Sequence, residues 1–132
     1  MMGKTPQTRL KEQYDSYESL INDIVHSLST SIGMADYIRI KAIELYDKMQ
    51  PITHTLPHKM AVDCVYLAAN AEGVRASVRG IQAITKGLYG FNIRPETHKW
   101  VMEHIDDVCE TLKCNMADLP LRGRIASVDS SE

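Results

Sequence analysis

Five cationic side chains in the second half of the chain could contact phosphate groups. They are Arg75, Arg79, Lys86, Arg94 and Lys99. Within this stretch Glu96 is the only acidic residue, and Lys and Arg are the side chains that bind nucleic-acid phosphates. The whole chain carries 15 Lys and Arg against 17 Asp and Glu. A nucleic-acid surface must therefore be local, and the alternative is that these cations only solvate the surface.

Aromatic residues offer a second kind of surface, because aromatic anchors are enriched where proteins bind one another. Most of those outside the two middle helices are Tyr14, Tyr17, Tyr89, Phe91 and Trp100. The alternative is that some of them close the core, which we expect for Trp100. For Tyr89 the sequence does not decide between binding and closing the core. With the five cations it is a candidate nucleic-acid or partner-binding residue.

Histidine and cysteine residues form no recognisable ligand pattern. The two groups considered are His54, His58 and Cys64, and His98, His104, Cys109 and Cys114. Their spacings fit no common zinc pattern. There is also no nucleophile elbow and no phosphate loop, and the adjacent Asp106 and Asp107 point in different directions on a helix. We expect no metal, no cofactor and no enzymatic activity.

Length and composition indicate one intracellular domain. A chain of 132 residues can bury a substantial core but is too short for two domains. Three cysteines are an odd number, and Lys4 and Arg9 interrupt any early apolar run, so we expect no signal peptide. No apolar stretch approaches the roughly 18 residues of a membrane span. The compartment expected is a prokaryotic cytoplasm or a nucleus.

The segment from His58 to Glu72 is the element that the other helices must surround. Lys59, Asp63, Tyr66 and Asn70 follow one another at spacings of four, three and four, so they form one narrow polar stripe on a helix. The remaining positions are almost all apolar. A helix that is apolar on most sides belongs in the middle of a domain. Pro57 is suited to start it and Gly73 to end it.

Four further helices are predicted around this segment. The first is long, beginning at Thr5 and Pro6 and ending before Gly33, and the second runs from about Ala35 to Gln50. A short helix follows the N-cap Ser77, and the last starts at Pro95 and ends near residue 112. We expect an N-terminal helical extension over residues 1–19, a helical domain over residues 20–114 and a flexible tail over residues 115–132.

This helical order, with the third helix buried by the other four, resembles a cyclin box. In particular it resembles one repeat of the transcription factor IIB family, which includes archaeal transcription factor B. The residues that carry the resemblance are Ile32, Gly33 and Met34, then Ala42, Leu45 and Tyr46, then Val62, Val65, Tyr66, Ala68 and Ala69, and finally Gly73, Val74, Arg75, Ser77, Ile81 and Ile84. The match covers roughly residues 20–112, and the resemblance implies a five-helix, all-α fold.

The resemblance implies a transcription-related module that contacts DNA, a TATA-binding protein or RNA polymerase. The chain departs from the family in having one repeat and no Cys-x-x-Cys pair for a zinc ribbon. The loop expected between the fourth and fifth helices is also longer, by Leu88 to Phe91. A reduced relative of this kind, for instance a viral one, would bind one partner. The alternative is a cyclin-like regulatory subunit that binds only proteins. Whether the first helix pairs with a second copy of itself is left open.

Overall fold

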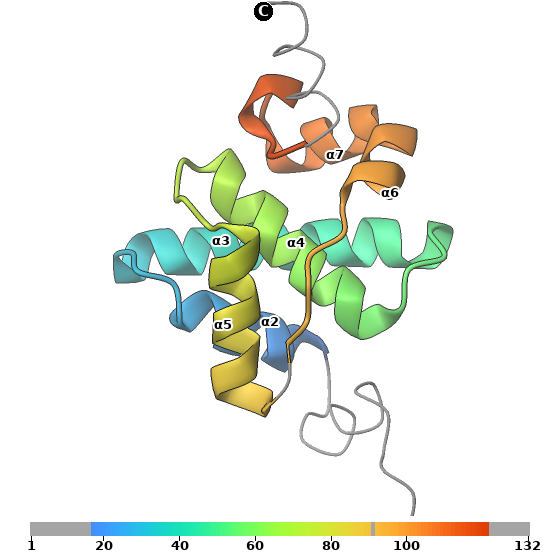
Figure 1. Ribbon diagram of the computed structural model, residues 1–132. Coiled ribbons are helices and arrows are strands. Elements are labelled where there is room, and N and C mark those ends of the chain that lie inside the picture. The colour runs from blue at the N-terminus through green and yellow to red at the C-terminus, as the bar shows by residue number, and fades with distance from the viewer. Residues whose placement is uncertain (1–16, 91, 122–132) are drawn as a thin grey trace, which may run out of the picture.

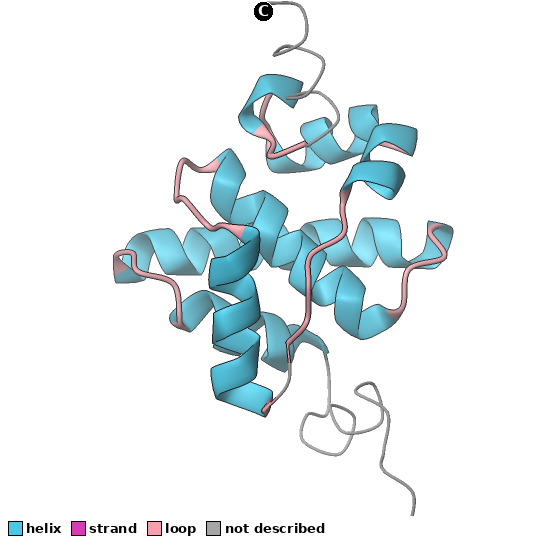
Figure 2. Ribbon diagram, in the orientation of Figure 1, coloured by secondary structure: helices cyan, strands magenta, loops and turns pink. Residues whose placement is uncertain are grey.

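The computed structural model describes residues 17–90 and 92–121, and all regular structure within these ranges is helical (Figures 1 and 2). The six α-helices are α2 (Tyr17–His26), α3 (Ile32–Met49), α4 (Pro57–Ala71), α5 (Val78–Tyr89), α6 (His98–Glu103) and α7 (Ile105–Leu112). Two short 3-10 helices are η1 (Gln50–Ile52) and η2 (Met116–Asp118). The predicted all-α class is confirmed. No helix in these ranges has the length and apolarity needed to cross a bilayer.

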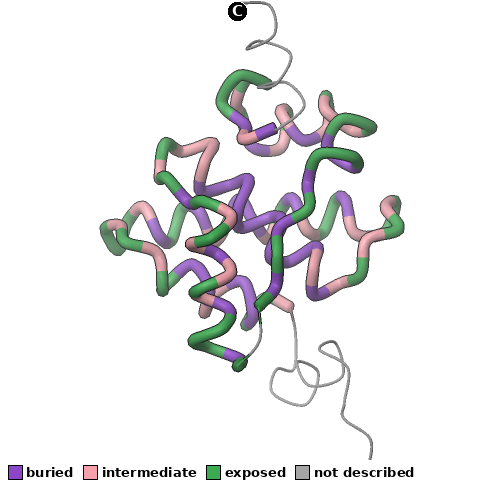
Figure 3. Tube along the Cα trace, in the orientation of Figure 1, coloured by how far each residue is buried: buried purple, intermediate pink, exposed green. Residues whose placement is uncertain are grey.

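Helix α4 is the central element, as predicted. It contacts α2, α3 and α5, and Figure 3 shows that it is buried along most of its length. The buried set includes small side chains at Ala61, Ala68 and Ala69, which let neighbouring helices approach closely. Gly73 has φ 80 and follows the last turn, so the predicted end of this helix is also correct.

Helices α2 and α3 supply most of the aliphatic packing around α4. The buried residues of α2 are Leu20, Ile21, Ile24 and Val25, and the buried apolar residues of α3 are Ala35, Ile38, Ala42, Leu45 and Met49. Gly33 does not stop a helix, as the sequence had suggested, but lies in the first turn of α3. The reason is Ser31, whose side-chain oxygen accepts a hydrogen bond from the Met34 amide at 3.2 Å and caps the helix one turn earlier.

Helix α5 begins where the sequence predicts and ends later. The Ser77 hydroxyl oxygen accepts a hydrogen bond from the Gly80 amide at 2.9 Å, which confirms Ser77 as the N-cap. The helix continues through Leu88 and Tyr89, which had been assigned to a loop. Gly90, with φ 86, ends it in the left-handed conformation that favours glycine.

The predicted fifth helix is divided in two and starts later than Pro95. Residues 92–97 form an extended connection, and α6 begins at His98. The helical conformation is interrupted at His104, where φ is −130° and ψ is 33°, and α7 follows. Val101, Val108 and Leu112 nevertheless lie in the core, and so does Trp100, as expected. The inward-facing pattern was therefore correct although the helix carrying it is interrupted.

The segment after α7 is more ordered than expected. Residues 115–121, assigned to the flexible tail, contain η2 and two leucines, Leu119 and Leu121, that are 1% and 0% exposed. The core domain thus extends at least to Leu121, because burying these side chains ties the chain to the helices. Residues 122–132 of the predicted tail lie outside the described residues, as do residues 1–16 of the predicted N-terminal extension.

Candidate binding face of α5 and the connection to α6

The connection between α5 and α6 is anchored to the polar stripe of α4. The Asp63 side chain is fully buried, and each of its carboxylate oxygens accepts one hydrogen bond. Oδ1 accepts from the Glu96 amide at 3.0 Å, and Oδ2 accepts from the Trp100 indole nitrogen at 2.9 Å. One side chain of the central helix therefore fixes both the connection and the first turns of α6.

Burial raises the pKa of Asp63 to about 6, although the hydrogen bonds from Trp100 and Glu96 and the nearby Lys59 act in the opposite direction. Removing a carboxylate from water disfavours its charged form, and here this effect exceeds the stabilisation by its donors. The anchor of the connection is thus a titratable group whose charge changes just below neutral pH.

The rest of the stripe holds neighbouring segments. Lys59 forms an ion pair with Glu96, so the carboxylate of the connection is occupied by α4. The Asn70 side-chain amide donates to the carbonyl oxygens of Tyr66 and Ala76, at 2.8 and 2.9 Å, and so ties the end of α4 to the loop before α5. The polar stripe found in the sequence therefore binds the loop before α5, the connection and the start of α6 to the central helix.

The five predicted cations are all exposed. Arg75 precedes α5, Arg79 and Lys86 lie seven residues apart on one face of it, Arg94 is in the connection and Lys99 is on α6. Among residues 17–90 and 92–121 none of the five forms an ion pair, whereas Lys59 of α4 does. We call these five residues the basic face.

Charge along the chain is uneven around this face. Four of the 15 Lys and Arg residues, and none of the 17 Asp and Glu residues, lie between Gly73 and Pro95. The first acid after this interval is Glu96, whose charge is offset by Lys59. A small excess of positive charge is thus concentrated on α5 and the connection in a chain that is slightly acidic overall.

Tyr89 does not belong to the basic face. Its side chain is 4% exposed and lies in the core cluster. The sequence placed it in a glycine-rich loop between the fourth and fifth helices, but α5 continues through this residue, and its side chain is buried. As a contact residue for a partner, Tyr89 is therefore a poor candidate.

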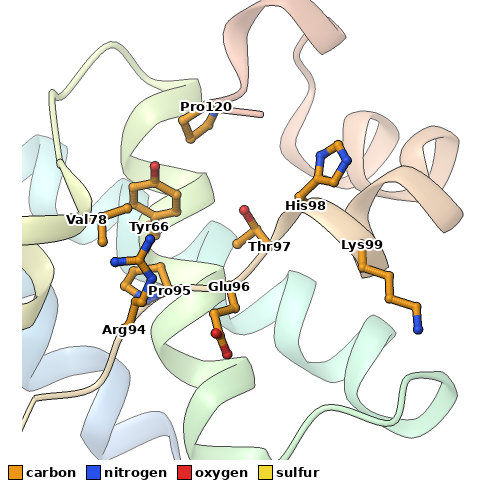
Figure 4. A pocket seen from close by; sticks show the side chains of 9 residues that line it. All are labelled: Tyr66, Val78, Arg94, Pro95, Glu96, Thr97, His98, Lys99 and Pro120. Atoms are coloured by element: carbon orange, nitrogen blue, oxygen red, sulfur yellow. The ribbon is translucent and has the colours of Figure 1, made fainter. Parts of the chain in front are cut away.

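A pocket of about 330 Å³ lies beside the connection (Figure 4). Its lining residues are Tyr66, Val78, Arg94, Pro95, Glu96, Thr97, His98, Lys99 and Pro120. Tyr66, Thr97 and His98 were not identified as site residues from the sequence, because the extended path that brings them together depends on the contact with Asp63. Arg94 and Lys99 belong to both the pocket and the basic face.

A second pocket, of about 360 Å³, lies between α6 and the segment before α4. Its lining includes Ile52 at the end of η1 and His54 from the loop before α4, and Glu96 and Lys99 are shared with the first pocket. Ile52 is 53% exposed, and Leu56, which follows the lining residue Thr55, is 51% exposed. Two exposed apolar side chains therefore lie at or next to this pocket.

The histidines and cysteines are not gathered into a metal site in the part of the chain that the structure describes, where no cluster of three or more His, Cys, Asp or Glu side chains is arranged to hold an ion. Cys64 is buried, and Cys109 and Cys114 are half-buried; all three are free thiols.

Comparison of the chain with protein-family models, with curated proteins and with solved structures found no match. The geometry of the basic face and its pocket therefore carries the functional argument.

Proposed function

We propose that this domain is a nucleic-acid-binding module of the transcription machinery, in which the basic face contacts phosphates. The observation that carries the proposal is the exposure of all five cations together with the pairing of Glu96 to Lys59. Cations that are already paired must break a contact before they bind a phosphate, and these five have no such contact with another described residue. The resemblance to one transcription factor IIB repeat supports the same class of function.

The uneven distribution of charge determines which surface of the protein faces the nucleic acid. A duplex approaching the molecule is attracted to the stretch from Gly73 to Pro95, which lacks acids, and is repelled by the acidic remainder. Phosphate contacts of this kind orient a protein on nucleic acid but carry no base sequence information. The proposed module therefore holds nucleic acid with little sequence preference, and specificity would come from a protein partner such as a TATA-binding protein or a polymerase.

The test is the salt dependence of binding to a DNA duplex. The double charge reversal Arg75→Glu with Arg79→Glu should abolish binding at low salt, while Arg39→Glu with Lys48→Glu on α3 serves as the matched control. In the unchanged protein the logarithm of the binding constant should fall linearly with the logarithm of salt concentration, by about 0.9 per phosphate contacted. Circular dichroism checks that both variants are folded.

Either of two results would overturn the proposal. One is a binding constant that does not change with salt. The other is equal loss of binding in both double variants, because that would show only an effect of net charge. Loss confined to the Arg75 and Arg79 variant assigns the contacts to the basic face.

A second candidate function is a protein-interaction module, such as a cyclin-like regulatory subunit that does not bind nucleic acid. The observation in its favour is the exposure of Ile52, which lines the second pocket, and of Leu56, which follows the lining residue Thr55, since exposed apolar side chains beside a hollow are typical of protein interfaces. Ile52→Asp with Leu56→Asp should then remove a protein partner and leave duplex binding unchanged. A protein that binds no duplex at low salt but loses a partner in this variant has the second function.

A further inference from the structure

The pocket at Arg94 differs from the rest of the surface in the character of its polar groups. Thr97 has a hydroxyl group, and Arg94 and His98 have nitrogen donors; in Figure 4 these side chains border the same space. Each can donate a hydrogen bond. A hollow with donors on several sides is suited to an oxyanion, whose oxygen atoms only accept.

The one carboxylate in the lining does not oppose this. In Figure 4 the Glu96 side chain points away from Tyr66 and His98, and it forms an ion pair with Lys59. The pairing with Lys59, through a hydrogen bond and through charge, lowers the pKa of Glu96, so this carboxylate stays ionised and bound to α4. Repulsion of an anion by Glu96 is thereby reduced.

The pocket also has apolar walls, formed by Val78, Pro95 and Pro120. Its volume of about 330 Å³ lies at the lower end of the range of about 300–1,000 Å³ for small-molecule pockets. A bare inorganic anion would leave the apolar walls without a partner. The expected ligand therefore combines an oxyanion with a compact organic group.

We propose that this pocket binds a phosphate monoester that carries a compact organic group, with Arg94 holding the phosphate and the proline and tyrosine walls contacting the organic part. In a domain that binds nucleic acid, two sources supply this chemistry, a free nucleoside 5′-monophosphate and the 5′-phosphorylated end of a strand. Because Arg94 also belongs to the basic face, the second source rests on the proposed function. Arginine is suited to the role because its planar group donates two parallel hydrogen bonds to phosphate.

The pocket is held in shape before any ligand arrives. Arg94 and Thr97 lie on either side of Glu96, whose amide is bonded to the buried Asp63. The preceding residue Ile93 is fixed as well, because its amide donates to the Thr85 hydroxyl oxygen at 2.9 Å. A binding segment fixed at both ends loses little conformational freedom when a ligand binds.

The experiment is a titration of the ¹⁵N-labelled protein followed by NMR. Adenosine 5′-monophosphate should shift the amide signals of Thr97 and His98 in a saturable way, and adenosine should not. Arg94→Gln and Thr97→Val should each weaken binding of the monophosphate at least tenfold. Arg39→Gln on α3 is the matched control and should bind normally. The fluorescence of Trp100, two residues after His98, checks that each variant keeps its local fold.

A second arm separates the two sources with a short single strand carrying either a 5′-phosphate or a 5′-hydroxyl group. Tighter binding of the phosphorylated strand supports the strand end, and equal binding of both strands together with saturable monophosphate binding supports a free nucleotide. No saturable shift, or equal affinity in the Arg94→Gln protein, overturns the proposal. Failure of the proposed function looks different, because duplex binding would then be independent of salt or be lost equally in the two double variants.

Discussion

The two sides of helix α4 are held by different kinds of contact. Toward α2 and α3 the helix packs through fully buried aliphatic side chains such as Leu20, Ile38 and Leu45. Toward the connection between α5 and α6 it offers the polar stripe, where Asp63 accepts two hydrogen bonds and Lys59 pairs with Glu96. One side of α4 is thus held by buried apolar surface, and the other by hydrogen bonds and an ion pair, which depend on direction.

The two kinds of contact have different roles, because one determines stability and the other determines the geometry of the site. Aliphatic packing stabilises in proportion to the area buried and tolerates many arrangements of similar volume. A carboxylate with two donors accepts them only in a narrow range of positions. We infer that the first side supplies most of the stability, whereas the second decides where Arg94, Thr97 and His98 lie.

The largest expected effect is on the aliphatic side. Leu45→Ala removes a fully buried side chain between α3 and α4, so the free energy of unfolding should fall by about 2–5 kcal/mol. Urea denaturation followed by circular dichroism measures this. Exposed Ile40→Ala on the same helix is the control and should change stability by less than about 0.5 kcal/mol. Equal losses in the two variants would contradict the division between the two sides.

A smaller effect is expected from the charge of Asp63. In the folded protein the Asp63 carboxyl group, whose pKa is about 6, keeps its proton up to about that pH, whereas an aspartate with the ordinary pKa loses it near 3.8. The folded state therefore binds the proton more tightly, and the contribution to stability is full below pH 3.8 and is lost as pH rises to about 6. The loss should reach at most about 3 kcal/mol.

The measurement is urea denaturation at pH 4 and pH 7 of the unchanged protein and of Asp63→Asn. Burial lowers the pKa of His58, which acts in the opposite direction because stability is lost when pH falls below 6.5. His58 is present in both proteins, so its contribution cancels in their difference. If the two proteins show the same change between pH 4 and pH 7, Asp63 does not titrate as stated. The fluorescence of Trp100, the only tryptophan, reports on the hydrogen bond from its indole nitrogen to Asp63, which Asp63→Asn removes.

The smallest effect is expected at the edge of the polar stripe. Lys59→Gln removes the ion pair with Glu96, whose side chain is 63% exposed, so stability should fall by less than about 1 kcal/mol. The same change should weaken binding of an anion in the pocket, because Glu96 would lose its partner and oppose the ligand. Lys48→Gln, which removes the exposed ion pairs of α3 with Asp107 and Glu110 of α7, should have a similarly small effect on stability and none on the pocket.

The sequence predicted those parts of the fold that depend on local patterns. The apolar surface of residues 58–72 predicted a buried helix, Ser77 predicted a helix start, and the spacing of Val101, Val108 and Leu112 predicted an inward face. Each follows from one segment alone, because helical periodicity and capping need no knowledge of the neighbours.

The connection could not be predicted because it depends on a residue far away in the chain. Pro95 suits the first turn of a helix and an extended segment equally well, and the choice is made by Asp63, 33 residues from Glu96. The sequence identified Asp63 as part of a polar stripe but did not reveal its partners. The break at His104 is marked by no proline or glycine, and nothing in the structure explains it.

The burial of Leu119 and Leu121 has a practical consequence for how this protein is handled. Pro120, between them, lines the pocket, so a truncation before Leu119 would remove one wall of the candidate ligand site together with two core side chains. Shortened versions of this protein should therefore keep the chain at least as far as Leu121. A fluorophore is better attached to a cysteine introduced at Tyr37 on α3, which is 39% exposed and does not line the pocket.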